Sequence, residues 1–306
     1  MIMGFRNWLK RISLFKKMYI NLLIGYYRFL TLLSPKLNTK IRYKQVFGKK
    51  MDLRNPKTLN DKILKLKLEK YGKDPLVKKC ADKFAVREYV SSCDYGDILV
   101  PLIAIYDKVS EIEWDRLPES FAMKWNFGCG YNIICPKKSE LDIVSSIKKM
   151  KKWKNSKKYL DYSEVQYMGV KKKILVEEYL SSIDNVFPAD YKVYCFNGIP
   201  RAILYMDDRG KECIRAAFFD IDWNYIGKPQ NSKYLDFDFL PSKPECLTKM
   251  IEASKRLSLP FEFVRVDFYC VGGKLYFGEM TFTPAGGFFV SQCLIDGLPM
   301  GHYLKM

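Results

Sequence analysis

The sequence predicts a mixed α+β protein, and three observations carry this prediction. Short segments rich in β-branched and aromatic residues are separated by glycine turns, most clearly at 261–270 and 275–282, as in antiparallel strands. Elsewhere apolar residues recur every three or four positions, which is the period of a helix. Hydrophobic residues make up 48% of the 306 residues, which suffices for a sizeable core.

The segment 261–289 carries the strongest indication of chemistry. A period of two places Arg265 and Asp267 on one face of the first strand, and Glu279 interrupts the apolar second strand. A buried carboxylate is costly unless a cation or a hydrogen-bond donor compensates it. Mg²⁺ prefers one or two carboxylates together with phosphate oxygens and water. We therefore predict that Asp267 and Glu279 bind Mg²⁺, and an ordinary hairpin with its charges in solvent is the alternative.

The register of this hairpin sets a condition on that prediction. A strict two-residue turn at 272–273 pairs Asp267 with Gly278 and sends Glu279 to the opposite face. The two carboxylates converge only if one strand contains an extra residue, so we predict a bulge at Gly278. A period of two alone also places Leu275 and Phe277 on the face of Glu279.

A second motif lies upstream, where a lysine in a short apolar strand at 121–125 precedes a Gly-x-Gly turn. Lys124 would be buried there without a partner, and a nucleotide phosphate would supply one. Gly128 and Gly130 allow backbone amides to approach phosphate oxygens closely. The motif is not a Walker A loop, and a hairpin whose glycines only turn the chain is the alternative.

Six segments, taken in order and spacing, suggest a family. They are ADKFAVREYV (81–90), FAMKWNFGCGYNIIC (121–135), VEEYL (176–180), DYKVYCFNG (190–198), RVDFY (265–269) and GKLYFGEMTFTPAGG (273–287). Together they resemble the TupA-like branch of the ATP-grasp superfamily, which is associated with teichuronopeptide and capsular polysaccharide synthesis. The resemblance covers about residues 49–287. One departure is Thr281, because many ATP-grasp enzymes have Asn two residues after the metal-binding Glu.

The resemblance implies an ATP-grasp fold, in which two α+β subdomains enclose Mg-ATP, and carboxylate–amine ligation through an acylphosphate. It divides the chain into a basic amphipathic N-terminal segment (1–48), a region of helices and strands (49–120) and an ATP-grasp core (121–306). Thr281 would be a third metal ligand. Arg265 would stabilise negative charge on the transferred phosphoryl group.

The resemblance also assigns the nucleotide contacts. Lys124 and Lys192 would contact the ATP phosphates, under the glycine loop that ends at Asn132. Asp184 would bind the ribose. The hinge between the subdomains would meet the adenine edge with four consecutive residues: Glu177, Glu178, Tyr179 and Leu180.

Composition excludes several classes of catalytic and metal site. The one histidine, His302, lies near the C-terminus of the sequence, which excludes Ser-His-Asp hydrolysis and His-ligated zinc. Nine cysteines without a C-x-x-C pair argue against a disulfide framework and indicate a reducing compartment, so a cytoplasmic protein is expected.

The formal net charge of +18 predicts attraction to polyanions. Nucleic acid is not favoured, because the sequence has no helix-turn-helix, zinc-finger or RRM signature. An acidic polysaccharide, a carboxylate-bearing substrate or an anionic membrane surface is expected instead. The alternative is an ordinary surface that happens to be rich in lysine.

The segment that begins at Phe5 and ends at Leu33 combines apolar and basic residues at helical spacing, which predicts an amphipathic helix. Its longest uncharged run, 18–27, is too short to span a bilayer, and Ser34 begins a break in the helix. Two interpretations remain open for this helix. It lies on the inner face of an anionic membrane, or it packs on the body of the protein.

Two expectations concern the region before the core. A helix beginning at Pro75 is expected to continue through the motif at 81–90, with Lys83 and Arg87 on a solvated face. The resemblance gives the alternative that this region contacts substrate or phosphate. The apolar run 98–106 is expected to form a buried strand.

The sequence thus predicts an ATP-dependent ligase that joins a carboxylate to an amine in cell-surface polysaccharide or teichuronopeptide biosynthesis. Two alternatives remain open. A phosphotransferase could use the same Mg-ATP site with a hydroxyl acceptor. A membrane-associated assembly factor could bind nucleotide without catalysing a reaction.

Overall fold

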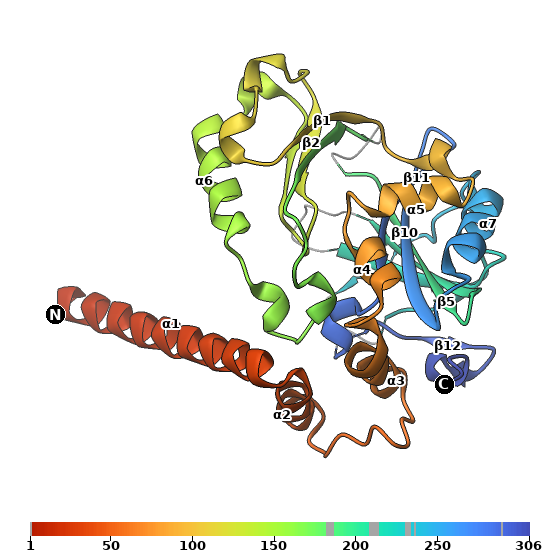
Figure 1. The fold of residues 1–306 in the computed structure, drawn as a ribbon, viewed down its shortest axis with the longest axis horizontal. Coiled ribbons are helices and arrows are strands. Elements are labelled where there is room, and N and C mark those ends of the chain that lie inside the picture. The colour runs from red at the N-terminus through yellow and green to blue at the C-terminus, as the bar shows by residue number, and fades with distance from the viewer. Residues whose placement is uncertain (1, 182–186, 208–213, 230–233, 236, 289) are drawn as a thin grey trace. The chain divides into compact units, whose positions relative to one another are not determined.

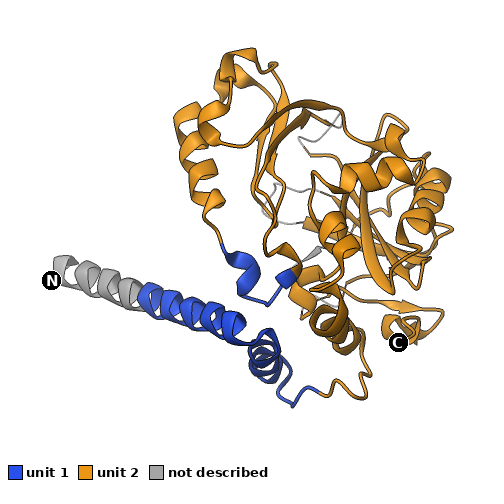
Figure 2. Cartoon of the chain, viewed as in Figure 1, with its two compact units in different colours: residues 1–51, 157–165 blue, residues 52–156, 166–306 orange. Residues whose placement is uncertain are grey.

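The computed structural model describes residues 2–181, 187–207, 214–229, 234–235, 237–288 and 290–306, with side chains described from residue 16 except at 234 and 235. The chain forms two compact units, one made of residues 1–51 and 157–165 and the other of residues 52–156 and 166–306 (Figure 2).

The smaller unit contains helices α1 (Ile2–Leu33) and α2 (Pro35–Phe47). The predicted N-terminal helix is confirmed, and it ends where Ser34 accepts a hydrogen bond from the Leu37 amide to cap α2. The sequence pattern does not predict α2, because no regular apolar stripe runs along it. A buried polar cluster connects the two segments of this unit. Asn38 Nδ2 donates to Thr31 Oγ1 at 2.6 Å and to Ser163 Oγ at 3.0 Å.

The described part of the larger unit contains a seven-stranded sheet. Its main path runs β11-β10-β5-β6-β7-β8 with antiparallel neighbours, and β9 pairs in parallel with β7. Helix α7 (Leu247–Ser258) packs against β5, β6 and β10. The strands are β5 (Asp190–Phe196), β6 (Ile199–Asp207), β7 (Ile214–Phe219), β8 (Tyr225–Gly227), β9 (Tyr234–Leu235), β10 (Phe263–Val271) and β11 (Lys274–Thr281).

A second, four-stranded antiparallel sheet has the order β1-β4-β2-β3. Its strands are β1 (Leu102–Tyr106), β2 (Phe121–Trp125), β3 (Asn132–Cys135) and β4 (Ile174–Glu178). Helix α6 (Ile143–Lys154) covers it, and the Trp125 indole donates to the Met150 carbonyl at 3.1 Å. The strand expected at 98–106 is confirmed from Leu102 to Tyr106. Its expected burial is wrong, because β1 lies at the sheet edge and Ile103 and Ile105 are exposed.

Three short helices precede the sheets: α3 (Leu59–Leu66), α4 (Pro75–Ala81) and α5 (Val86–Ser92). Thr58 and Asp61 form a capping box at α3, which a π-helical turn at Lys67–Tyr71 follows. The expected continuous helix through 81–90 is wrong. The Asp82 carboxylate accepts from the Phe84 amide at 2.8 Å and separates α4 from α5.

Each sheet has its own hydrophobic core. In Figure 1, α6 and α7 lie in separate places. The larger core includes buried Phe263, Phe268 and Leu257, and the smaller one includes buried Phe121 and Trp125. The predicted α+β class with two subdomains is therefore confirmed. The remaining described strands, β12 (Leu294–Ile295) and β13 (Leu298–Pro299), form a small hairpin near the C-terminal end.

The structure contains one disulfide, although the sequence argues against a disulfide framework. Cys246, just before α7, and Cys270 in β10 are joined by a disulfide across a Cα–Cα distance of 6.5 Å. Among the other described cysteines, five are buried thiols and Cys129 is an exposed one.

Candidate functional site

The hairpin of β10 and β11 contains the predicted bulge. Asp267 pairs with Glu279 and Phe268 pairs with Phe277, which leaves Gly278 as the extra residue. A Cβ atom at Gly278 would lie 2.9 Å from the Asp267 carbonyl oxygen, so a side chain does not fit there without a shift. The two carboxylates therefore converge on one face. The prediction that Phe277 shares the face of Glu279 is wrong, because the bulge puts Phe277 on the other side of the sheet.

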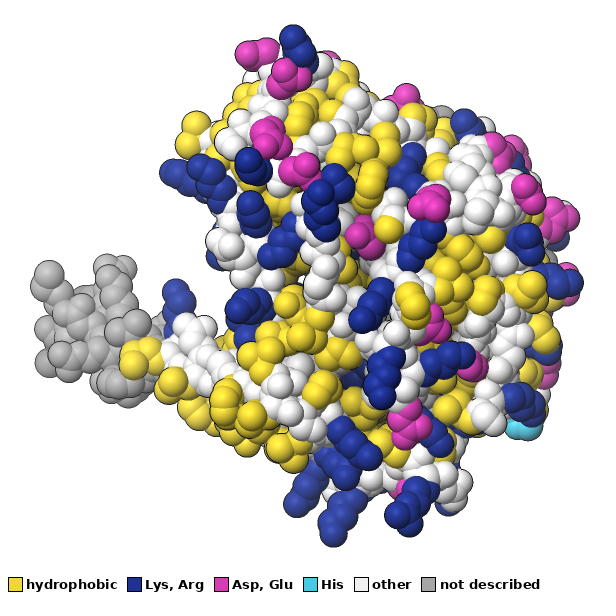
Figure 3. All heavy atoms as spheres, in the orientation of Figure 1, with side chains coloured by type: hydrophobic (Ala, Val, Ile, Leu, Met, Phe, Trp, Pro, Cys, Tyr) yellow, Lys and Arg dark blue, Asp and Glu magenta, His cyan; other side chains and the backbone are white. Residues whose placement is uncertain are grey.

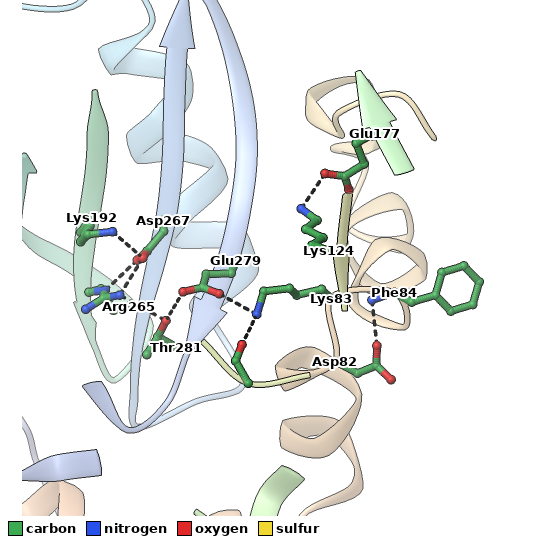
Figure 4. A network of polar contacts seen from close by, with 11 residues as sticks. Asp82, Lys83, Phe84, Lys124, Glu177, Lys192, Arg265, Asp267, Glu279 and Thr281 are labelled. Carbon is green, nitrogen blue, oxygen red and sulfur yellow. Dashed lines mark hydrogen bonds and ion pairs between the residues drawn. The ribbon is translucent and has the colours of Figure 1, made fainter. Parts of the chain in front are cut away.

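Asp267 is buried among cations. Arg265 donates to it with two nitrogens, Nε to Oδ1 at 2.7 Å and Nη2 to Oδ2 at 2.6 Å. Lys192 Nζ lies 2.9 Å from Asp267 Oδ2 (Figure 4). It also lies 3.0 Å from Asp190 Oδ2. Since β5 lies beside β10, strand pairing alone brings Lys192 opposite Asp267. These contacts compensate a carboxylate that is 4% exposed.

Glu279 lies on the same face, and its side chain is one-third exposed. Lys83 Nζ is 3.0 Å from Glu279 Oε2, and the Thr281 hydroxyl donates to Oε1 at 3.4 Å. Burial alone would favour the neutral acid, but Lys83, followed by Arg265 and Lys192, outweighs it and lowers the pKa of the Glu279 carboxyl to about 2. Glu279 is therefore an anion at neutral pH.

Lys83 connects this hairpin to the glycine loop. Its ammonium group also donates to the Gly128 carbonyl at 2.8 Å. Figure 4 shows Lys83 between the hairpin and the short helices. The expected solvated face is wrong for both cations of the motif: the side chains of Lys83 and Arg87 are 15% and 17% exposed. Arg87 Nη1 lies 3.3 Å from Glu177 Oε1. The break between α4 and α5 turns Lys83 inward, and helical periodicity does not reveal it.

Asn126, fully buried after β2, joins three segments and was not predicted as a site residue. Its side-chain amide donates to Asp82 Oδ2 at 2.8 Å, and its carbonyl accepts from the Lys83 amide at 2.9 Å. Its Oδ1 accepts from the Lys173 amide. The available signal is a buried amide at the end of an apolar strand, since such a group needs hydrogen-bond partners. Asn126 thus fixes the backbone from which Lys83 projects.

Most of the residues predicted to contact the nucleotide line one pocket in the larger unit. Apolar side chains of Val100, Ala122 and Ile134 line it together with Tyr269 from β10. Six predicted residues line it as well: Lys124, Asn132, Glu177, Glu178, Tyr179 and Leu180.

Lys124 has a partner of its own, contrary to the expectation. Its Nζ lies 2.5 Å from Glu177 Oε2, and Glu177 is buried between Lys124 and Arg87. Gly128 and Gly130 adopt φ values of 68° and 78° in the adjoining turn. The predicted ribose contact, Asp184, lies outside the described residues.

The predicted site residues that the structure describes form two neighbouring groups in the larger unit. One is the pocket beside β4. The other is the polar cluster on the β10–β11 hairpin, where Lys192 and Arg265 surround the predicted metal ligands. Lys83 and Arg87 belong to the turn and helix between them, and each pairs with a carboxylate of one group.

A model of the TupA-like ATP-grasp family matches residues 61–295. The chain belongs to this family. The match spans both sheets, the glycine turn and the bulged hairpin, so the resemblance predicted from short motifs is confirmed. Comparison with curated proteins gives no match.

Several solved structures are similar to the chain at low sequence identity. D-alanine–D-alanine ligase from Bacillus anthracis, solved with ATP, is 14% identical with a TM-score of 0.41 over 67% of this chain and 57% of that one. VanG D-Ala:D-Ser ligase from Enterococcus faecalis is 16% identical with a TM-score of 0.40 over 74% of this chain and 59% of that one. The chain therefore spans less than two thirds of the length of these ligases.

Proposed function

We propose that this protein is an ATP-dependent ligase that activates a carboxylate as an acylphosphate and transfers it to an amine. The observation that supports the proposal most is the bulge at Gly278. It brings Asp267 and Glu279 together beside three cations, next to a partly apolar pocket. Family membership adds the expectation of an ATP site in this fold.

The donor atoms suit Mg²⁺ that arrives with a nucleotide. Asp267, Glu279 and Thr281 present hard oxygen atoms on one face, and Mg²⁺ in proteins takes one or two carboxylates plus phosphate oxygens and water. The described residues include no group of three or more His, Cys, Asp or Glu side chains able to hold a metal. Bound Mg²⁺ would neutralise charge that develops on the phosphates.

Lysine and arginine side chains of this protein would stabilise the negative charge of the phosphates that Mg²⁺ does not neutralise. Lys83 and Lys192 now pair with carboxylates, and each can exchange that partner for a phosphate oxygen when nucleotide binds. Arg265 keeps its proton, because Asp267 offsets the cost of burial and raises the pKa of the guanidinium. We assign Arg265 the stabilisation of negative charge on the transferred phosphoryl group.

ATP would lie across the two groups of residues. The apolar pocket wall and the backbone of Tyr179 and Leu180 suit a flat base, and Lys124 at its edge suits a phosphate. The turn that contains Gly128 and Gly130 would cover the phosphates and exclude water from an acylphosphate, which would otherwise hydrolyse.

The substrates we propose are an acidic cell-surface polymer and an amine such as an amino acid, handled in the cytoplasm. The family's association with teichuronopeptide and capsular polysaccharide synthesis supports this choice. The surface of α6 supports it too, since an acidic polymer would bind a row of exposed lysines. These lysines are Lys148, Lys149, Lys151 and Lys152.

Calorimetry of ATP binding with and without Mg²⁺ tests the nucleotide site at physiological salt, where net charge alone contributes little. The double variant Asp267→Asn/Glu279→Gln should weaken Mg²⁺-dependent binding by at least roughly tenfold, that is, by about 1.4 kcal/mol or more. The control Asp222→Asn/Glu252→Gln removes the same charge from exposed positions and should bind as the wild type does. Equal binding by all three proteins would refute the site.

A turnover assay then tests the reaction. A ligase releases ADP and free phosphate only when both a carboxylate and an amine are present, and it forms an amide. Phosphate retained on a hydroxyl product would instead identify a phosphotransferase.

A further inference from the structure

Helix α1 exposes a continuous apolar face in the smaller unit. Met18, Leu22, Tyr26, Phe29 and Leu33 follow one another at intervals of three or four residues, which places them on one side of the helix. Their exposed fractions lie between 49% for Tyr26 and 71% for Leu22. Figure 3 shows hydrophobic side chains in yellow along the described part of this helix. Exposed apolar side chains in such a row are unusual on a protein surface.

The opposite face of α1 accounts for the packing of the helix. Tyr27, Leu30 and Thr31 are buried, and the Tyr27 hydroxyl donates to Gln45 Oε1 of α2 at 2.9 Å. Arg28 at the edge pairs with Asp161 at 2.6 Å. Because these contacts hold α1 by one side only, the apolar face remains available to a partner.

The segment that forms α1 and α2 contains basic residues and no acidic ones. The first 51 residues contain twelve Lys and Arg and no Asp or Glu, so they account for two thirds of the net charge of +18. Lys16 and Lys17 precede the apolar row and are exposed, as are Lys36 and Lys40 of α2. Lys40, Lys44 and Lys50 also line one pocket of the unit, with Ile41, Gln45 and Met51. An exposed apolar row beside exposed basic residues matches the chemistry of an anionic lipid surface.

We propose that α1 binds the surface of an anionic lipid bilayer, with its apolar face among the acyl chains near the headgroups. The lysines of α1 and α2 contact the phosphates of the lipids. Tyr26 suits the boundary because its ring is apolar and its hydroxyl is polar. No described helix is long and apolar enough to cross a membrane. The proposal does not depend on the ligase activity.

Co-sedimentation of the full chain with vesicles tests this surface. Vesicles that contain phosphatidylglycerol should bind the protein at least roughly tenfold more strongly than pure phosphatidylcholine vesicles, and high salt should weaken the binding. Leu22→Asp/Phe29→Asp should reduce binding to the anionic vesicles by at least about tenfold, since both side chains point outward and lose apolar contact with lipid. Lys36→Gln/Lys40→Gln should reduce it in part.

Matched controls separate lipid binding from other causes. Val144→Asp/Phe239→Asp changes two exposed apolar residues of the larger unit and should bind vesicles as the wild type does. ATP binding should be the same in all variants, so that a failure of the nucleotide site is distinguished from a failure of this proposal.

Two results would overturn the proposal. One is equal binding to neutral and anionic vesicles, or none to either. The other is sedimentation equilibrium without lipid that shows a dimer which Leu22→Asp/Phe29→Asp dissociates, together with no vesicle binding. In that case the face joins two copies of the chain.

Discussion

At the scale of single residues, Lys83 shows how much of the site depends on one cation. It compensates Glu279 and holds the Gly128 carbonyl, so Lys83→Ala leaves a partly buried carboxylate without its nearest cation. We expect the free energy of unfolding to fall by roughly 1–3 kcal/mol, measured by urea denaturation. The control Lys79→Ala removes a surface pair with Glu88 and should cost less than about 1 kcal/mol. If both variants lowered the free energy of unfolding equally, the contacts of Lys83 would contribute no more than a surface ion pair.

Acid titration examines the same carboxylate. The folded-state pKa of Glu279 is lowered to about 2, whereas an unfolded Glu has a pKa of about 4.3. A lowered pKa adds stability above the unfolded value, and that contribution is lost as the pH falls toward the folded value. The stability difference between wild type and Glu279→Gln should therefore shrink from pH 5 to pH 2 in urea unfolding. A difference that is constant over this range would contradict the assigned pKa.

Cys129 lies in the glycine turn and provides a chemical probe of it. It is exposed, whereas burial raises the pKa of the Cys195 and Cys293 thiols to about 12 and makes them unreactive. Maleimide should modify Cys129 before these two at pH 7, and Mg-ATP should slow this modification if the turn covers nucleotide. Mass spectrometry of tryptic peptides, with Cys129→Ser as the control, gives the site. A rate that Mg-ATP leaves unchanged would argue against a covering loop.

At the scale of elements, the bulge is the feature that sequence alone could locate. The turn at 272–273 fixes the count of residues between the two acids, and the requirement that they converge leaves one extra residue, at Gly278. The break between α4 and α5 has a local and a distant cause. Asp82 accepts from the Phe84 amide two residues on, which is a signal that helical periodicity does not register. Asn126 also donates to Asp82 from 44 residues further along the chain, and local pattern contains no information about that contact.

Replacing Gly278 in the bulge, with Gly272 in the hairpin turn as the control, tests whether the bulge requires glycine. Gly278→Ala should destabilise the protein by about 1–3 kcal/mol and weaken Mg²⁺-dependent ATP binding, because the new Cβ meets the Asp267 carbonyl. Gly272→Ala also strains a left-handed residue, with φ of 55°, but nothing lies within 4 Å of its Cβ. It should cost about 1 kcal/mol and leave ATP binding unchanged. Calorimetry and thermal unfolding measure both effects.

At the scale of the whole molecule, composition predicted the class of protein better than it predicted the pairing of charges. Two cores around two sheets follow from the strand and helix patterns, and the structure contains both. Lys124 and Lys83 were expected either to await a phosphate or to face solvent. Instead each pairs with a carboxylate from a distant segment, Glu177 or Glu279. Such partners are set by tertiary packing, which a single sequence does not show.

The net charge itself makes a prediction for the entire chain. At +18, repulsion between like charges opposes folding, and salt screens it. The melting temperature should therefore rise as KCl is increased from about 0.05 to 0.5 M, a range over which the screening length falls severalfold. Differential scanning calorimetry checks this, with sucrose as an uncharged control. A melting temperature that falls with KCl would mean that ion pairs contribute more than repulsion.

The bulge at Gly278 has one more consequence. A regular ladder continued from Phe268 and Phe277 would pair Asp267 with Gly278 and turn Glu279 to the other side of the sheet. The bulge keeps Glu279 on the side of Asp267. It also increases the local twist of β11, and this twist sets the direction in which the carboxylate points along the sheet. One glycine thus sets both the side and the direction of a predicted metal ligand.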